Sequence, residues 1–181
     1  MIGRMSGSCG CGAAALVLAA GVGACARLPE SDGELLVPDR AVFPVVADAL
    51  ELRCATLDCH GAPGRNLRLH SGTGLRLEAT DVPGSGSTTE AEYDASYRAI
   101  VALEPAVLDV VLAEGGARPE RLTLVRKGRG AEKHAAGAVL AEGDDADRCL
   151  VSWLSRSVDE DACGRAADFG PPAGWPGDVP P

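Results

Sequence analysis

Two cysteines followed directly by a histidine form the group of residues with the clearest chemistry in this sequence. Cys54 and Cys59 are separated by four residues, and His60 follows the second cysteine. Each thiol can form a thioether with a vinyl group of haem, and the imidazole can then bind the iron. The usual spacing in c-type haem attachment is two residues between the cysteines. The residue types favour a covalently attached haem with His60 as its proximal ligand.

The second axial ligand must come from a short set of candidates. Met1 and Met5 are the only methionines, and both precede the expected mature N-terminus. His/Met coordination is therefore excluded, which leaves His70, His134, a lysine, water or no ligand. His70 leaves the chain little length to pass from one haem face to the other, whereas His134 lies much farther along. We predict that His60 and His134 bind the iron. Because a methionine thioether raises the potential, we also predict a comparatively low midpoint potential.

Other interpretations of the same residues stay open. Cys54 and Cys59 could form a disulfide across a small loop, with His60 as a solvated neighbour. The two cysteines with His60 and His134 could bind zinc, although the ligand spacing is borderline and the compartment is oxidising. His134 lies in a glycine-rich loop and could equally be an exposed surface residue.

The N-terminal segment predicts export from the cytoplasm. Residues 1–24 contain a short apolar core that is typical of a secretory signal peptide and too short for a stable membrane helix. Val22-Gly-Ala-Cys25 resembles a bacterial lipobox, in which Cys25 is diacylated and becomes the N-terminus. Ordinary cleavage near Ala24 or Ala26 is the alternative. We expect a lipid-anchored protein of the cell envelope, periplasmic or surface-facing. The outer membrane is favoured because Ala26 does not resemble the aspartate that retains lipoproteins in the inner membrane.

The remaining cysteines restrict the possible cross-links. Seven cysteines are present, of which Cys9 and Cys11 leave with the signal peptide and Cys25 takes the lipid. Unpaired thiols are unusual in an oxidising compartment. Either haem takes Cys54 and Cys59 while the last pair forms a disulfide, or two disulfides form. In both cases we expect a structural disulfide between the last two cysteines, which are Cys149 and Cys163.

Charge and motifs exclude several function classes. Acidic side chains outnumber basic ones by 26 to 17, giving a net charge of −9. Such a surface repels nucleic acid, which is therefore not an expected partner. No nucleophile elbow, His-Glu-x-x-His motif or phosphate loop is present, so we expect no enzyme. The acidic run Asp144-Asp145-x-Asp147 lacks the glycine and glutamate of a calcium loop and suits the first turn of a helix.

Apolar spacing predicts a mainly α-helical domain with minor β content. A polar tether over 25–40 precedes a single domain over 41–163, and a Pro/Gly-rich disordered tail follows over 164–181. Segments 66–69 and 75–77 are expected to form a small β-hairpin or a pair of extended strands. A short strand is expected over 121–125. The first predicted helix begins near Val42, and its buried stripe is expected to contain Phe43, Val46, Leu50 and Cys54. Further helices are predicted over 91–103, from Pro105 to Gly115, and from Asp144 or Asp145.

The order of these features resembles a class I, monohaem cytochrome c domain over about Val42 to Leu154. A helix leads into Cys54-x4-Cys59-His60-Gly61, followed by a polar loop, middle helices and a final helix with Trp153. The resemblance implies an electron-transfer protein that binds haem c and docks an unknown redox partner. The same fold without haem, held by two disulfides, would be a structural or binding module of the envelope.

The four-residue spacing departs from the family pattern and sets a structural condition. On an uninterrupted helix, five steps would place Cys54 and Cys59 about 140° apart around the axis. One haem edge can reach both sulfurs only if the backbone leaves the helix between them.

Overall fold

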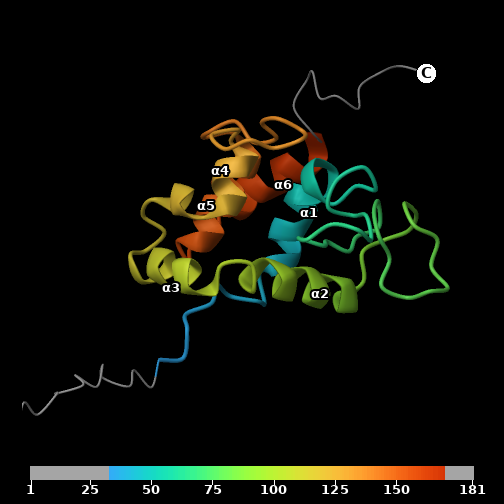
Figure 1. The fold of residues 1–181 in the computed structure, drawn as a ribbon, viewed down its shortest axis with the longest axis horizontal. Helices are drawn as coiled ribbons and strands as arrows, with labels where there is room; N and C mark the ends of the chain where they lie inside the picture. The colour runs from blue at the N-terminus through green and yellow to red at the C-terminus, as the bar shows by residue number, and fades with distance from the viewer. Residues whose placement is uncertain (1–32, 170–181) are drawn as a thin grey trace, which may run out of the picture. The chain divides into compact units, whose positions relative to one another are not determined.

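The computed structural model describes residues 33–169, and this part of the chain is mainly α-helical, as predicted. Figure 1 shows α2 and α3 following one another along one side, with α1, α5 and α6 packed together beside them. The elements in chain order are α1 (Phe43–Cys54), α2 (Glu90–Val101), α3 (Pro105–Ala113), the 3-10 helix η1 (Pro119–Arg121), α4 (Thr123–Gly128), α5 (Asp145–Leu154) and α6 (Glu160–Phe169).

The predicted β content is wrong for the described residues. Segments 66–69 and 75–77 form no hairpin, and the only β-pairing in this part of the described chain is an isolated bridge of His70 with Leu75. The segment 121–125, expected as a strand, joins the end of η1 to the start of α4. Glu104 explains this outcome, because its carboxylate accepts hydrogen bonds from the Thr123 N–H at 2.6 Å and from the Thr123 hydroxyl at 2.9 Å. A side chain from another element thus satisfies a helix N-terminus that the local sequence does not cap.

An aromatic cluster fixes α1 against α2 and α5. The Phe43 ring lies 5.5 Å from the Tyr97 ring and 5.2 Å from the Trp153 ring, measured between centroids. Such edge-on and tilted contacts are favourable arrangements of aromatic pairs. Phe43, Val46 and Leu50 are all buried, which confirms the predicted inner stripe of the first helix. The core is otherwise mostly aliphatic.

The end of the expected tether is part of the folded domain. Residues 36–40, placed in the tether by their polarity, are hydrogen bonded to helices far along the chain. The Tyr97 hydroxyl donates to the Pro38 carbonyl at 2.7 Å, and Trp153 Nε1 donates to the Asp39 carbonyl at 3.0 Å. A buried Trp or Tyr needs a partner for its polar atom, and this segment supplies both acceptors.

A sixth helix replaces the beginning of the expected disordered tail. Residues 164–169 belong to α6, whose first turn is acidic, and Asp159 Oδ1 accepts the Ala162 N–H at 3.0 Å. Ala162, Cys163 and Ala166 are buried, so small side chains allow α6 to approach α1 and α5 closely. The predicted Cys149–Cys163 disulfide is confirmed, with Cα atoms 4.8 Å apart. It joins α5 to α6, and such a loop closure contributes about 3 kcal/mol.

The beginnings of two helices are capped by local side chains. Asp144 accepts the Asp147 N–H at 2.8 Å and is the N-cap of α5, one of the two predicted residues. Thr89 and Glu92 form a reciprocal capping box at the start of α2. These caps satisfy N–H groups that a helix cannot pair internally.

No helix within residues 33–169 is both long and apolar enough to cross a membrane. The expected signal peptide over 1–24, the lipidation site Cys25 and the final residues 170–181 lie outside the described residues.

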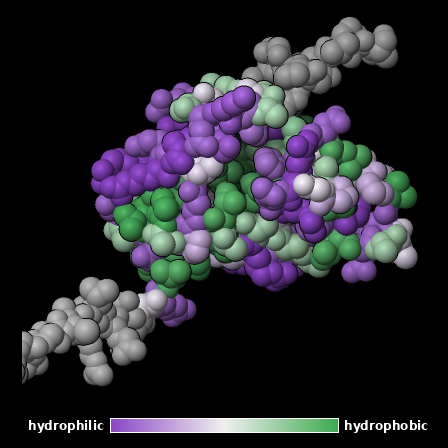
Figure 2. Space-filling model, viewed as in Figure 1, coloured by the Kyte–Doolittle hydropathy of each residue, from purple (hydrophilic) through white to green (hydrophobic). Residues whose placement is uncertain are grey.

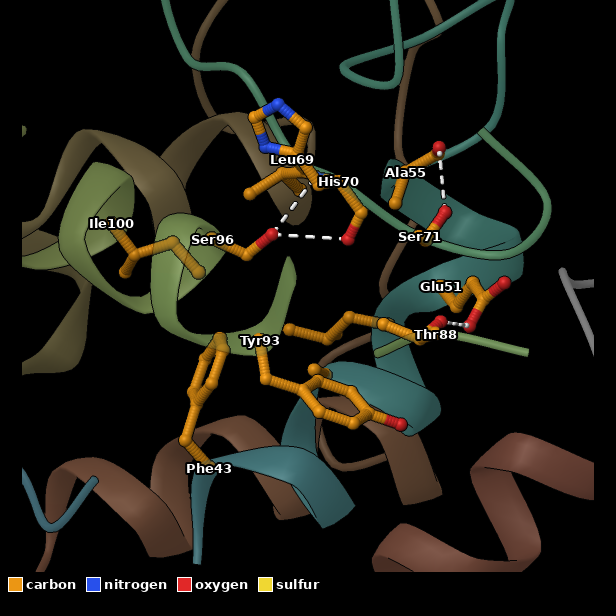
Figure 3. A pocket seen from close by; sticks show the side chains of 12 residues that line it. Phe43, Glu51, Ala55, Leu69, His70, Ser71, Thr88, Tyr93, Ser96 and Ile100 are labelled. Atoms are coloured by element: carbon orange, nitrogen blue, oxygen red, sulfur yellow. Dashed lines mark hydrogen bonds between the residues drawn. The ribbon is translucent and has the colours of Figure 1, made fainter. Parts of the chain in front are cut away.

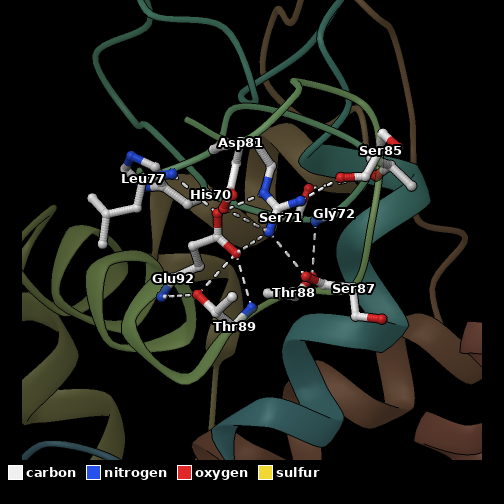
Figure 4. A network of polar contacts seen from close by, with 12 residues as sticks. His70, Ser71, Gly72, Leu77, Asp81, Ser85, Ser87, Thr88, Thr89 and Glu92 are labelled. Carbon is white, nitrogen blue, oxygen red and sulfur yellow. Dashed lines mark hydrogen bonds and ion pairs between the residues drawn. The ribbon is translucent and has the colours of Figure 1, made fainter. Parts of the chain in front are cut away.

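A buried ion pair holds the long segment between α1 and α2 (Figure 4). Arg76 Nε donates to Glu92 Oε1 at 2.7 Å, and the Leu77 and Thr89 N–H groups donate to the same carboxylate. The Arg76 guanidinium also donates to the Ser85 and Ser87 carbonyls. Burial alone would raise the pKa of Glu92, but the hydrogen bonds from Arg76, Thr89 and Leu77 outweigh it and lower the pKa to about 2.

Glu92→Gln should lower the free energy of unfolding by about 3 kcal/mol near pH 7, because it leaves Arg76 without its charged partner. The folded pKa lies below the ordinary 4.5, so this stabilisation is complete above about pH 5 and is lost as the pH falls toward 2. Urea unfolding at a series of pH values measures it.

The control is Glu90→Gln on the same helix turn, whose side chain is 75 % exposed and pairs with Arg40. This exposed pair should contribute less than 1 kcal/mol. Equal effects of the two substitutions, or a Glu92→Gln effect independent of pH, would contradict the assignment.

Candidate functional site

A pocket of about 420 Å³ brings together the four residues that the sequence singled out. It lies between the end of α1 with its following loop and α4 with its following loop. Figure 2 shows this face of the molecule, hollowed between these segments, with hydrophobic residues in the hollow and hydrophilic ones beside it. Its volume falls within the range of cofactor sites. The lining includes Cys54, Cys59, His60, His134, Leu67, Leu103, Leu124 and Val139.

The backbone leaves the helix between the two cysteines, as haem attachment requires. Helix α1 ends at Cys54, and the next residues form turns. The His60 N–H donates to the Cys54 carbonyl at 2.8 Å, and the Cys59 N–H donates to the Thr56 carbonyl at 2.9 Å. This closed loop brings both thiols and the imidazole to one pocket despite the four-residue spacing.

The turn closes tightly around the Ala55 carbonyl. A Cβ at Gly61 would lie 1.9 Å from the Ala55 oxygen, and one at Gly74 would lie 1.8 Å from it. The Ser71 hydroxyl donates to the same oxygen at 3.2 Å. Only glycine fits at either position, so Gly61, directly after His60, is fixed by the geometry of the turn.

Both histidines have the hydrogen bonding of metal ligands. His60 Nδ1 lies 3.0 Å from the Leu67 carbonyl, and His134 Nδ1 lies 3.2 Å from the Gly137 carbonyl. A carbonyl acceptor requires a proton on Nδ1, which leaves Nε2 as the lone-pair nitrogen. Burial lowers the pKa of His60, the bond to Leu67 raises it, and nearby cations lower it further, so its pKa lies below the usual value. The neutral, ligand-competent imidazole is favoured.

The two imidazoles are spaced for a single metal ion between them. Their ring centroids are 5.9 Å apart and their planes differ by 7°. Two metal–nitrogen bonds of about 2 Å each, plus the distance from each nitrogen to its ring centre, give a separation of about 6 Å. The separation of the two rings therefore fits two imidazoles on one ion. Their planes are stacked, so both rings must turn edge-on for the Nε2 atoms to face that ion. The two rings come from segments 74 positions apart in the sequence.

The two thiols in the pocket are free. Cys54 and Cys59 are partly buried and make no disulfide. Burial, followed by the neighbouring Cys59, raises the pKa of Cys54 to about 12, while Arg53 lowers it. The second disulfide considered from the sequence is absent from the described structure. Within residues 33–169, no group of three or more His, Cys, Asp or Glu is arranged to hold a metal ion, so the zinc interpretation gains no support.

The charged residues of the lining are all basic. Arg53, Arg65 and Lys127 border the pocket, and no carboxylate does, although the chain is acidic overall. Arg65 donates to the Cys59 carbonyl at 2.9 Å and has no carboxylate partner among the described residues. Lys127 is paired with Glu132 at 3.2 Å. Such a rim suits an apolar ligand that carries acidic groups.

The alternative ligand His70 lies elsewhere. It lines a separate cavity of about 20 Å³ between α1 and α2, large enough for about one water molecule. Figure 3 shows that Ser96 bonds the His70 backbone there, while the His70 ring points away from Ser96. His70 is therefore not brought to the large pocket.

One pocket residue escaped the sequence analysis. Arg53 is 6 % exposed, and it borders the pocket beside Cys54. Arg53 lies three positions after Leu50, on the same buried side of α1, and this spacing was the signal that could have indicated its burial. An arginine is rarely buried without a partner, so the sequence alone favoured a solvated side chain.

Gly61→Ala should lower the free energy of unfolding by about 2 kcal/mol or more, because the new methyl overlaps the Ala55 carbonyl and the backbone turn must open. Urea unfolding followed by circular dichroism measures the change. Gly64→Ala is the matched control, since a Cβ there meets nothing within 4 Å. Equal stability of the two variants would show that the turn does not need glycine.

Comparison with known proteins does not extend this assignment. No protein-family model, curated protein or solved structure matches the chain.

Proposed function

We propose that this protein is a c-type haem-binding, electron-transfer lipoprotein of the bacterial cell envelope. The parallel pair of imidazoles, each oriented through Nδ1 by a backbone carbonyl, carries the proposal. Binding of an organic ligand without a metal ion does not require two imidazoles at this separation. The two free thiols beside His60 supply the further requirement for covalent attachment.

Cys54 and Cys59 would hold the haem by thioethers. In each addition the thiol sulfur bonds to one vinyl carbon and the thiol hydrogen goes to the other, so no atom leaves and no oxidant is needed. His60 and His134 would be the axial ligands. The haem iron would supply one-electron chemistry.

The remaining lining residues would control the surroundings of the haem. Leu67 and Val139 are buried and exclude water from the pocket walls. Leu103 is 38 % exposed at the pocket, so the ligand edge beside it would be available to a redox partner. Lipidation at Cys25 would keep the domain at a membrane surface.

Covalent attachment predicts a specific mass for one tryptic peptide. Cleavage after Arg53 and Arg65 releases residues 54–65, which contain both cysteines and His60. In protein produced with a haem-ligation system, this peptide should weigh its amino acids plus one intact haem. The Soret band should survive denaturation.

The double variant Cys54→Ser, Cys59→Ser should lose the band from denatured protein and serves as the control. A wild-type peptide that is lighter than its amino acids by two hydrogens would contain a disulfide. That result would leave a haem-free structural or binding module in place of an electron carrier.

Bis-histidine ligation predicts a low midpoint potential that responds to the sixth ligand. His134→Met should raise the potential, because a thioether favours the reduced iron, and redox titration measures the shift. His70→Gln should leave the potential unchanged. A wild-type potential typical of His/Met cytochromes, or no response at position 134, would contradict the ligand assignment.

A further inference from the structure

Arg53 connects the two halves of the pocket. It lies on the last turn of α1, next to Cys54, on the side of the pocket that carries His60. Its Nη1 donates to the Val139 carbonyl at 3.2 Å and lies 3.4 Å from Asp144 Oδ2. Val139 ends the loop that carries His134, and Asp144 lies shortly after it. The Arg53 side chain thus contacts residues that lie 86 and 91 positions after it in the sequence.

The loop with His134 is bound to α4 at both ends and through Glu132 and Lys133, which contact Arg126 and Lys127. The Val139 and Leu140 N–H groups donate to the Gly128 carbonyl at 2.8 and 2.9 Å, which closes the loop onto the end of α4. His134 itself bonds only to Gly137 within that loop. These contacts all join the loop to α4, whereas the hydrogen bond from Arg53 to the Val139 carbonyl joins the end of the loop to α1.

The position of Arg53 is costly for stability alone. The side chain is almost fully buried, and its Nε has no hydrogen-bond partner among the described residues. A buried donor without a partner carries an unrecovered desolvation penalty. Because an apolar residue would fill the same volume without that penalty, the two contacts that Arg53 makes must have another role.

We propose that Arg53 is a positioning residue that sets the distance between His134 and His60. By holding the Val139 carbonyl and Asp144 against the end of α1, it fixes the loop so that the second imidazole stays at ligand distance. This inference rests on the proposed function, because the quantity that Arg53 controls is coordination by His134.

The test compares Arg53→Met with the wild type, both as full-length protein matured with haem. Methionine keeps an unbranched side chain of similar volume, although a shorter one, and removes the donors. Cyanide binding to the ferric protein requires His134 to leave the iron, and Arg53→Met should accelerate it about tenfold. Tenfold corresponds to 1.4 kcal/mol, within the contribution of a hydrogen bond from a charged group. Hydrogen exchange in residues 129–139 should accelerate as well.

Arg76→Met is the matched control, since Arg76 is another buried arginine but belongs to the Glu92 network away from the pocket. It should lower overall stability and leave cyanide binding unchanged. Arg53→Lys and Asp144→Asn are milder variants that decide the question if Arg53→Met does not accumulate. Asparagine keeps the N-cap of α5 while removing the charge near Arg53, and both variants should give an intermediate acceleration.

The outcomes separate the two proposals. If the wild type carries covalent haem but all three variants bind cyanide at the wild-type rate, Arg53 has no positioning role and the proposed function stands. Acceleration in Arg76→Met to the same extent would also overturn the inference, because general loosening would then explain it. A wild type without haem overturns both proposals.

Discussion

The closure of the chain at the end of α1 is the constraint on which the rest of the site depends. The His60 N–H bonds to the Cys54 carbonyl, so the helix stops at the first cysteine and the second returns to the same pocket. Gly61 and Gly74 allow this because neither carries a Cβ near the Ala55 oxygen. A continuing helix would have separated the thiols around its axis, whereas the turn brings both cysteines to one pocket despite the four residues between them.

Sequence patterns predicted the helical core because they depend on neighbours a few residues apart. Phe43, Val46 and Leu50 form the expected stripe, and Asp144 caps the expected helix. The errors occur where a distant group decides the structure. Glu104 accepts the Thr123 N–H at the start of α4, in a segment whose alternating apolar residues predicted a strand. The second half of α6 lies in the segment 164–181, whose Pro/Gly-rich composition predicted disorder.

The candidate site divides in the same way. Cys54, Cys59 and His60 lie close together in the sequence, so their spacing alone predicted a shared site. The pairing of His134 with His60 was predicted only by elimination, and the structure places their rings 5.9 Å apart. Arg53 was missed because nothing in its local sequence indicates the Val139 carbonyl that it reaches.

The devices that stabilise the fold are separate from the pocket. The Cys149–Cys163 disulfide joins α5 to α6, and the Arg76–Glu92 pair holds the segment before α2, and none of these four residues lines the pocket. The thiols of the pocket are therefore not needed as cross-links, and they stay available for a ligand. The cross-link and the ion pair that stabilise the fold thus leave the pocket lining free of structural bonds of their own. Under the proposed function, haem would enter a site whose two imidazoles already have the centroid separation of a ligand pair.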